Sequence, residues 1–309
     1  MRLIILKMQF PDKPIPLFDL HCDTFSEIYK RNLNLKSSNL HISLDKASIF
    51  TPYTQIASIW TDKSYTNDEG YDHFLRCVSY VNEQLSSLNV LPRFILGVED
   101  ARMLNRSLER LYVLYNCGVR VLTLCWKGLS CIGGSWDTDI PLTVFGADVV
   151  LECARLGITV DLSHASIPVQ RTVLDLGQKH GFAPIFSHSN SFTVCNHKRN
   201  VCDGIFSQTV EMGGLVGISL CPQHLSNEKN ACLSTIIKHI EHFLNLKGEN
   251  TLCLGCDFDG VDTLPTEIAS ITDLQKVYSA LVKAFGYHTT AKIFYQNAHN
   301  FFKNLYKGE

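Results

Sequence analysis

Short apolar or β-branched segments alternate along this 309-residue chain with segments of helical periodicity, and this alternation limits its folds more than any other feature. Eight such segments are candidate strands, at residues 17–20, 54–60, 94–98, 119–124, 158–160, 184–186, 215–220 and 252–254. Helical patterns occupy most of the gaps, at residues 72–88, 100–117, 144–156, 169–180 and 234–246, and two further helices are expected between residues 272 and 306.

Strands separated by helices pair in parallel through right-handed crossovers. Eight such units in a chain of this length favour a closed (β/α)₈ TIM barrel over an open, doubly wound sheet. No internal repeat, low-complexity stretch or long Gly/Ser linker divides the chain. We therefore expect residues 1–309 to form a single α/β domain, a (β/α)₈ TIM barrel with extra C-terminal helices.

Polar side chains with metal-binding groups follow or end five of the predicted strands. In chain order they are His21, Asp23, Glu99, His164, His188 and Asp257. In a TIM barrel the C-terminal ends of all strands meet at one mouth, so these side chains are expected to converge there.

Each of these residues, taken alone, has an ordinary structural explanation. A histidine can be buried with both ring nitrogens satisfied, and a carboxylate can sit at a helix N-terminus, where the dipole favours it. Three histidines and three carboxylates at one mouth are hard to obtain from independent structural needs. Imidazoles and carboxylates suit Zn²⁺, Mn²⁺, Fe²⁺ or Co²⁺ and outnumber the four ligands of one tetrahedral ion. The pattern predicts two ions bridged by Glu99, with a hydroxide between them that could attack a carbonyl.

The charge balance and the opening segment argue against several other classes of protein. The formal net charge is -2 and the sequence pI about 6.6, so no basic field favours nucleic acid as a partner. The opening MRLIILKMQF is too short for a signal-peptide core or a membrane span, which predicts a cytoplasmic protein with no membrane partner. The twelve cysteines lack regular spacing, which favours reduced, mostly buried thiols over disulfides.

A longer series of motifs runs in order across nearly the whole chain: LFDLHCD, ILGVED, LYNCGVRVLTL, LTVFGADVVLECARLGITVDLSH, PIFSHSN, HKRN and LGCDFDG. This series resembles the membrane (renal) dipeptidase family, peptidase M19, of the amidohydrolase-like metallo-barrels. The resemblance implies the same barrel and the hydrolysis of dipeptides, often with tolerance of a D-residue at the C-terminal position. It also implies that His21 and Asp23 hold one zinc ion, that His164 and His188 hold the other, and that Glu99 bridges them.

Four further positions take their expected roles from the same resemblance. Arg199, in HKRN, matches the arginine that receives the substrate's C-terminal carboxylate, and Asp257 matches the carboxylate that exchanges protons with the bridging water. Trp126 stands where mammalian members have a histidine that contacts the substrate's carbonyl oxygen, and Cys221 stands where many members have a tyrosine. The segment WKGLSCIGGS resembles bacterial members with tryptophan at that position, so we expect Trp126 to contact substrate and to alter substrate preference.

The sequence as a whole predicts a dinuclear zinc dipeptidase, with Mn²⁺ or Co²⁺ as substitute metals and a small-molecule dipeptide as substrate. Two alternatives stay open at this point. One is a related amidohydrolase acting on N-acyl amino acids or other small amides, and the other is a catalytically silent metal-binding barrel. The sequence does not fix the oligomeric state, and a homodimer is compatible with it.

Overall fold

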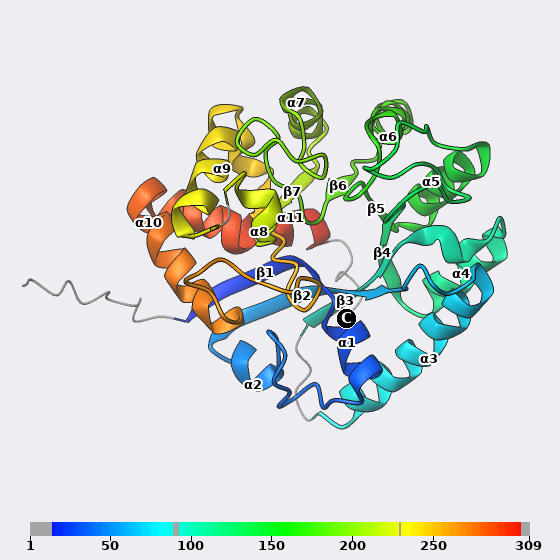
Figure 1. Ribbon diagram of the computed structural model, residues 1–309, viewed down its shortest axis with the longest axis horizontal. Coiled ribbons are helices and arrows are strands. Elements are labelled where there is room, and N and C mark those ends of the chain that lie inside the picture. The colour runs from blue at the N-terminus through cyan, green and yellow to red at the C-terminus, as the bar shows by residue number, and fades with distance from the viewer. Residues whose placement is uncertain (1–13, 89–92, 229, 304–309) are drawn as a thin grey trace, which may run out of the picture.

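The computed structural model describes residues 14–88, 93–228 and 230–303. Eight parallel strands close into a barrel in chain order, which confirms the expected fold. Figure 1 shows the larger helices arranged around this barrel. The strands are β1 (Ile15–Cys22), β2 (Phe50–Trp60), β3 (Arg93–Glu99), β4 (Val119–Thr123), β5 (Thr159–Asp161), β6 (Ile185–Phe186), β7 (Leu215–Ile218) and β8 (Leu252–Leu254).

The helices between the strands are α1 (Thr24–Arg31), α2 (Leu44–Ala47), α3 (Asn67–Ser86), α4 (Leu108–Asn116), α5 (Val144–Leu156), α6 (Ile167–His180), α7 (Asp203–Glu211), α8 (Pro222–Leu225) and α9 (Leu233–Asn245). Three 3₁₀ turns accompany them, η1 (Ala101–Leu104), η2 (Gly248–Asn250) and η3 (Ile271–Asp273). The chain continues with α10 (Leu274–Ala291), the π-helix η4 (Lys292–Gln296) and α11 (Asn297–Phe302).

The structure corrects several predicted helices. The single helix expected over residues 100–117 is wrong, because Asn105 and Arg106 adopt left-handed backbone angles and separate η1 from α4. Ser107 then begins α4, since its side chain accepts the backbone N–H of Arg110. Helices α1, α2, α7 and α8 were not predicted.

The C-terminal helices are less regular than the two that the sequence predicted. Gly286 (φ 79°, ψ 168°) breaks the helical geometry of α10, and a π-helical turn precedes α11. The predicted extension to residue 306 and the expectation for the opening ten residues both lie outside the described residues. Within the described ranges, no helix is long and apolar enough to cross a membrane.

Two apolar clusters form the core. The first lies inside the barrel, where residues such as Phe18, Ile56 and Ile95 pack with Ala298 and Phe302 of α11, and the second lies between the strands and the outer helices. All twelve cysteines are free thiols and most are buried, as predicted. On β3, alternation gives Ile95 and Glu99 the same inward direction, so Glu99 enters the barrel at its mouth.

The first and last strands meet at a narrow seam. Only Asp19 and Leu254 pair between β1 and β8 among the described residues. The Asp19 carboxylate reinforces this contact by accepting the backbone N–H of Cys256 at 2.9 Å, and it also accepts the backbone N–H of His21, in its own strand, at 3.2 Å. The seam therefore places the segment after β8 beside the end of β1.

Candidate metal centre

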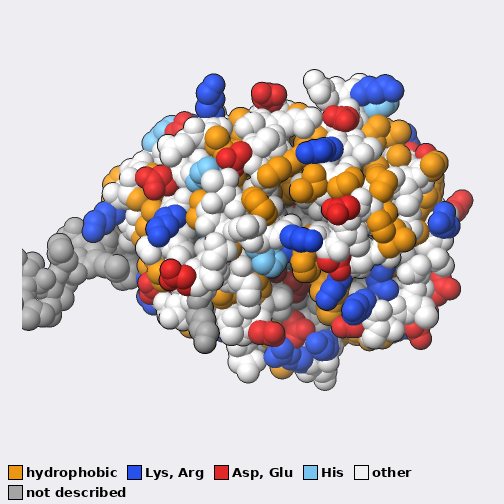
Figure 2. Space-filling model, turned by 45° about the horizontal axis from the view of Figure 1, so that its top comes forward, with side chains coloured by type: hydrophobic (Ala, Val, Ile, Leu, Met, Phe, Trp, Pro, Cys, Tyr) orange, Lys and Arg blue, Asp and Glu red, His pale blue; other side chains and the backbone are white. Residues whose placement is uncertain are grey.

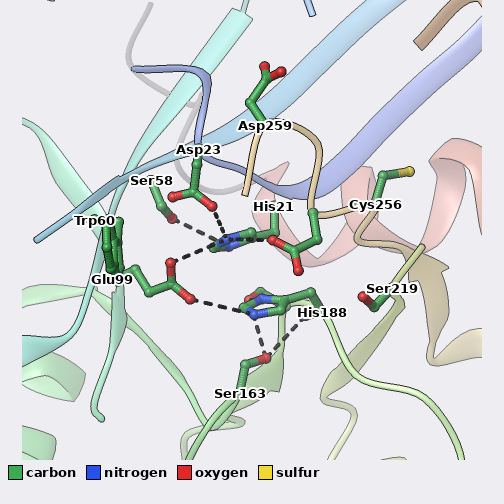
Figure 3. Close-up of polar contacts among 12 residues, drawn as sticks. His21, Asp23, Ser58, Trp60, Glu99, Ser163, His188, Ser219, Cys256 and Asp259 are labelled. Carbon is green, nitrogen blue, oxygen red and sulfur yellow. Dashed lines mark hydrogen bonds and ion pairs between the residues drawn. The ribbon is translucent and has the colours of Figure 1, made fainter. Parts of the chain in front are cut away.

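Six predicted site residues meet at the mouth of the barrel. His21 is the penultimate residue of β1 and Asp23 lies just beyond that strand, Glu99 is the last residue of β3, and His164, His188 and Asp257 follow β5, β6 and β8. Figure 3 shows Glu99 pointing between the rings of His21 and His188. Five of the six are at most 8% exposed, and the side chain of His164 is 12% exposed. The expected convergence is confirmed.

The carboxylates surround one nitrogen of His21. Its Nε2 lies 3.4 Å from Asp23 Oδ2, 3.7 Å from Glu99 Oε2 and 3.7 Å from Asp257 Oδ1. The other oxygen of Glu99, Oε1, faces away from His21 toward two further histidines. It lies 2.9 Å from His164 Nε2 and 3.6 Å from His188 Nε2. Glu99 thus stands between two groups of nitrogen and oxygen donors.

The neighbours of His188 and His164 fix which ring nitrogen carries the proton. Ser187 Oγ donates to Asp161 Oδ2 at 2.6 Å and accepts from His188 Nδ1 at 2.8 Å. His164 Nδ1 donates to the carbonyl oxygen of Trp126 at 3.2 Å. In both histidines the proton then resides on Nδ1, and the lone pair of Nε2 is directed into the centre.

These nitrogen and oxygen atoms would be better satisfied by bound cations than they are by contacts with one another. The two Nε2 atoms of His164 and His188 lie 2.9 Å apart, and two facing lone pairs repel unless a cation lies near both. His21 Nε2 and Asp23 Oδ1 are buried without a hydrogen-bond partner among the described residues. A Cβ atom added at Gly260 would lie 2.5 Å from Asp257 Oδ1 and closer still to Asp23 Oδ2, so only glycine leaves room for both carboxylates.

Burial and mutual charge shift the pKa values in this cluster. Burial raises the pKa of Glu99 well above its usual range and lowers those of His164 and His188 well below theirs. Burial also disfavours protonation of His21, but the negative charge of Glu99 and of its other carboxylate neighbours outweighs it and raises the pKa to about 10. The cluster therefore attracts positive charge strongly at the position of His21 Nε2.

Asp257 differs from the other carboxylates in its pKa. Burial raises this pKa to about 7, and the charges of His21 and Arg199 only partly oppose the shift. One oxygen each of Asp257 and Asp23 and a nitrogen of His21 lie within 4.8 Å of one another, a spacing that also suits metal ligands. The geometry alone thus allows a proton-transfer role or a ligand role for Asp257.

Arg199 lies beside the cluster and is buried without an acidic partner among the described residues. Its side chain is 5% exposed, its Nη2 donates to the carbonyl oxygen of His188 at 3.5 Å, and its Nε is buried without a partner. Within the described residues no carboxylate lies at ion-pair distance from it. A buried guanidinium without a counter-ion is costly, which indicates a place for an anionic ligand.

A cavity of about 530 Å³ opens from the cluster toward α1. Trp126 lines it together with Trp60, whose ring centroid lies 5.1 Å away in an edge-to-face arrangement. Figure 2 shows acidic side chains inside a hollow whose rim carries lysine, arginine and histidine side chains. Cys221 is buried near Arg199 and Asp257, with its Sγ 3.1 Å from Gln223 Oε1, and does not line this cavity.

Sequence reasoning missed the residues that orient the predicted ligands. Asp161 accepts four hydrogen bonds, from the side chains of Thr123 and Ser187 and from the backbone of Ser163 and Ser187. The sequence offered one indication of this role, because Asp161 lies at the end of a strand, three residues before His164. A second missed pair, Asp259 and His41, joins the segment after β8 to the loop after α1, and no local pattern marks it.

Comparison with known proteins gives consistent matches. The sequence profile of the membrane dipeptidase family, peptidase family M19, matches residues 12–307. An uncharacterised dipeptidase of Schizosaccharomyces pombe is 31% identical over 196 residues, which cover 61% of this chain and 47% of that protein. Dipeptidase aclJ of Aspergillus oryzae is 31% identical over 188 residues, or 58% of this chain and 43% of that protein. The chain therefore matches less than half the length of these two relatives.

A solved structure shares the fold over almost the whole chain. It is a metallopeptidase from Rhodobacter sphaeroides bound to a phosphinate mimic of the dipeptide L-Ala-D-Ala. The TM-score is 0.86 at 21% sequence identity, with 94% of this chain and 99% of that chain covered.

Proposed function

Because the chain belongs to the membrane dipeptidase family, peptidase family M19, we propose that it is a metal-dependent dipeptidase that uses two zinc ions. The observation that carries the substrate class is Arg199, a buried guanidinium beside the cluster with no acidic partner among the described residues. A free C-terminal carboxylate would supply the missing charge and bind the planar guanidinium at two points. A dipeptide places that carboxylate one residue beyond the scissile bond.

The donors divide naturally between two ions. His21 and Asp23 would hold one ion, His164 and His188 the other, and the two oxygens of Glu99 would reach one ion each. The orphaned His21 Nε2 and the space left by Gly260 support this assignment. Zinc bound there would supply Lewis-acid activation of water and of the peptide carbonyl, and Mn²⁺ or Co²⁺ suits the same nitrogen and oxygen donors.

Asp257 is the residue that moves the proton. Its carboxylate faces the cluster through Oδ1, and its pKa of about 7 makes both protonation states accessible near neutral pH. Asp257 Oδ1 takes the proton of the attacking water and later gives it to the nitrogen of the leaving amine. Arg199 meanwhile holds the carboxylate of the leaving residue and keeps the scissile bond at the cluster.

The C-terminal residue of the substrate can have D configuration under this proposal. Support comes from the Rhodobacter sphaeroides structure, which holds a mimic of L-Ala-D-Ala in the same fold. Trp126 provides an apolar wall in place of a histidine donor, so we expect substrate preference to differ from that of members with histidine.

The proposal is tested by assaying the purified, zinc-loaded chain against L,L, L,D and D,D dipeptides. N-acetylated, C-terminally amidated and tripeptide analogues are assayed in parallel. Free dipeptides should be cleaved and amidated ones should be poor substrates, because Arg199 would lose its ligand. Arg199→Lys should raise KM, whereas Arg106→Lys, at an exposed position, should not. Equal cleavage of amidated dipeptides would refute the assignment, and cleavage of N-acyl amino acids alone would favour the broader amidohydrolase class.

A further inference from the structure

A second cavity of about 530 Å³ adjoins the one that opens from the metal centre. Four residues line both cavities, namely Ser26, Glu27, Lys30 and Trp60. From this shared wall the second cavity continues between α1, the loop after β2 and α3. The two cavities therefore form one continuous space that begins at the metal centre and extends toward α3.

Trp60 places the shared wall close to the proposed bridging carboxylate. It is the last residue of β2 and pairs in register with Glu99, the last residue of β3, and Figure 3 shows the two side by side. Neighbouring strands lie about 4.8 Å apart, a distance that one large side chain can span. Under the proposed function Arg199 holds the C-terminal carboxylate, and Arg199 lines neither cavity. The N-terminal residue of a dipeptide is therefore the part that can extend past Trp60.

Three aromatic rings line the second cavity beyond Trp60. The ring centroid of His73, on α3, lies 5.3 Å from that of Tyr29, edge to face, and 5.3 Å from that of Tyr65. Tyr29, Trp60 and His73 are only partly buried, and Tyr65 is 38% exposed. Covering such ring surface with an apolar ligand is favourable, and aromatic rings add a preference for edge-to-face or offset contact. The lining therefore suits an aromatic group.

The charges that line the second cavity balance one another. Glu27 and Asp62 supply two negative charges, and Lys30 and Arg76 supply two positive ones. Lys30 Nζ lies 3.3 Å from Glu27 Oε1, so these two charges are paired. Burial, assisted by the charge of Arg76, lowers the pKa of His73, and its ring is therefore neutral at neutral pH. A lining without net charge favours neither a cationic nor an anionic ligand, which leaves an uncharged aromatic group as the best fit.

We propose that the second cavity, through the rings of Tyr29, Tyr65 and His73, receives the side chain of the substrate's N-terminal residue and selects dipeptides in which that residue is aromatic. The proposal rests on the proposed dipeptidase function and adds a substrate class to it. The edge-to-face pair of Trp60 and Trp126 in the first cavity forms the start of the same aromatic wall.

The test compares kcat/KM for Phe-Xaa, Ala-Xaa, Glu-Xaa and Lys-Xaa dipeptides that share one C-terminal residue. Phe-Xaa should exceed Ala-Xaa by about 10–100-fold, the effect of burying one large aromatic side chain, and should also exceed Glu-Xaa and Lys-Xaa. Tyr65→Ala should lower the Phe-to-Ala ratio by about 3–10-fold, mainly through KM, because one aromatic contact is lost. Tyr65→Phe keeps the ring and should retain the ratio. Arg102 Nη1 binds the carbonyl oxygen of Tyr65, and this backbone contact survives both substitutions.

A matched control and a binding measurement complete the test. Tyr112→Ala removes a tyrosine of similar exposure, 39%, from α4 outside both cavities and should leave the Phe-to-Ala ratio unchanged. Titration calorimetry with phosphinate dipeptide mimics bearing a phenylalanine-like or alanine-like N-terminal side chain measures the same preference without turnover. If Ala-Xaa matches Phe-Xaa, or if Tyr65→Ala changes the ratio no more than Tyr112→Ala, the inference is refuted while the dipeptidase function stands. If no dipeptide is cleaved at all, both fail.

Discussion

Gly260→Ala is a small substitution with a large expected effect on the metal centre. The backbone of Gly260 lies outside the left-handed region, so alanine is conformationally allowed there and the cost is one of space. The new Cβ would lie 2.5 Å from Asp257 Oδ1 and nearer still to Asp23 Oδ2, whereas Cβ atoms essentially never approach closer than 3.0 Å. Both carboxylates must therefore withdraw, and Asp23 must move by roughly 1 Å.

Metal coordination tolerates much less than this movement. Ligand distances in metal sites hold to within about 0.2 Å, so Asp23 cannot remain a normal ligand of the ion shared with His21. We expect zinc content to fall from about two ions per chain toward one after dialysis. We also expect kcat/KM to fall by about 100-fold, since a misplacement of about 1 Å at a reacting centre has that effect.

The assay combines elemental analysis, differential scanning calorimetry with and without zinc, and dipeptide hydrolysis. The matched control is Gly204→Ala, near the start of α7, where an added Cβ meets nothing within 4 Å. This control should stabilise the protein slightly, by about 0.4–1 kcal/mol, and leave zinc binding unchanged. If Gly260→Ala kept both ions and full activity, the assignment of Asp23 and Asp257 to a crowded metal centre would be wrong.

Three further results are expected. Zinc-supplemented protein should contain about two ions per chain and lose activity and thermal stability on chelation, because ligands of the folded state stabilise it; a metal content near zero would remove the central claim. Asp257→Asn should lower kcat by about 10² or more at unchanged zinc content, as for a lost general acid and base, whereas a loss of zinc would identify Asp257 as a ligand. Ser187→Ala should weaken zinc binding by about 10–100-fold, because His188 Nδ1 loses its hydrogen-bond acceptor; Ser189→Ala, which removes a hydroxyl without a partner among the described residues, should not.

The sequence predicted the barrel well because the apolar segments that mark the strands are followed by the polar residues that meet at the mouth. Glu99 illustrates this, because an apolar run ending in a carboxylate predicts the strand, and the alternation of side chains along a strand predicts the direction of Glu99. Residues 100–117 illustrate the opposite case. Their apolar spacing suited a continuous helix, and only the left-handed angles at Asn105 and Arg106 show where it breaks.

Contacts between distant loops were beyond the reach of sequence patterns. Asp259 and His41 are 218 positions apart, and neither lies in a regular element that would indicate its partner. The burial of Arg199 could not be predicted from the sequence either. Its motif suggested a carboxylate ligand, but only the folded chain reveals that the guanidinium is buried and lacks an acidic neighbour among the described residues.

The seam between β1 and β8 has a consequence for how the protein is made. His21 and Asp23 belong to the first strand region and Asp257 to the last, and the Asp19–Cys256 hydrogen bond that joins these regions spans 237 positions. During synthesis on the ribosome, the first two proposed ligands emerge long before the chain can close on them. The complete centre can form only after nearly the whole barrel has been synthesised, so a chain that stops before β8 would contain all five proposed metal ligands but neither Asp257 nor the closed barrel that holds them in place.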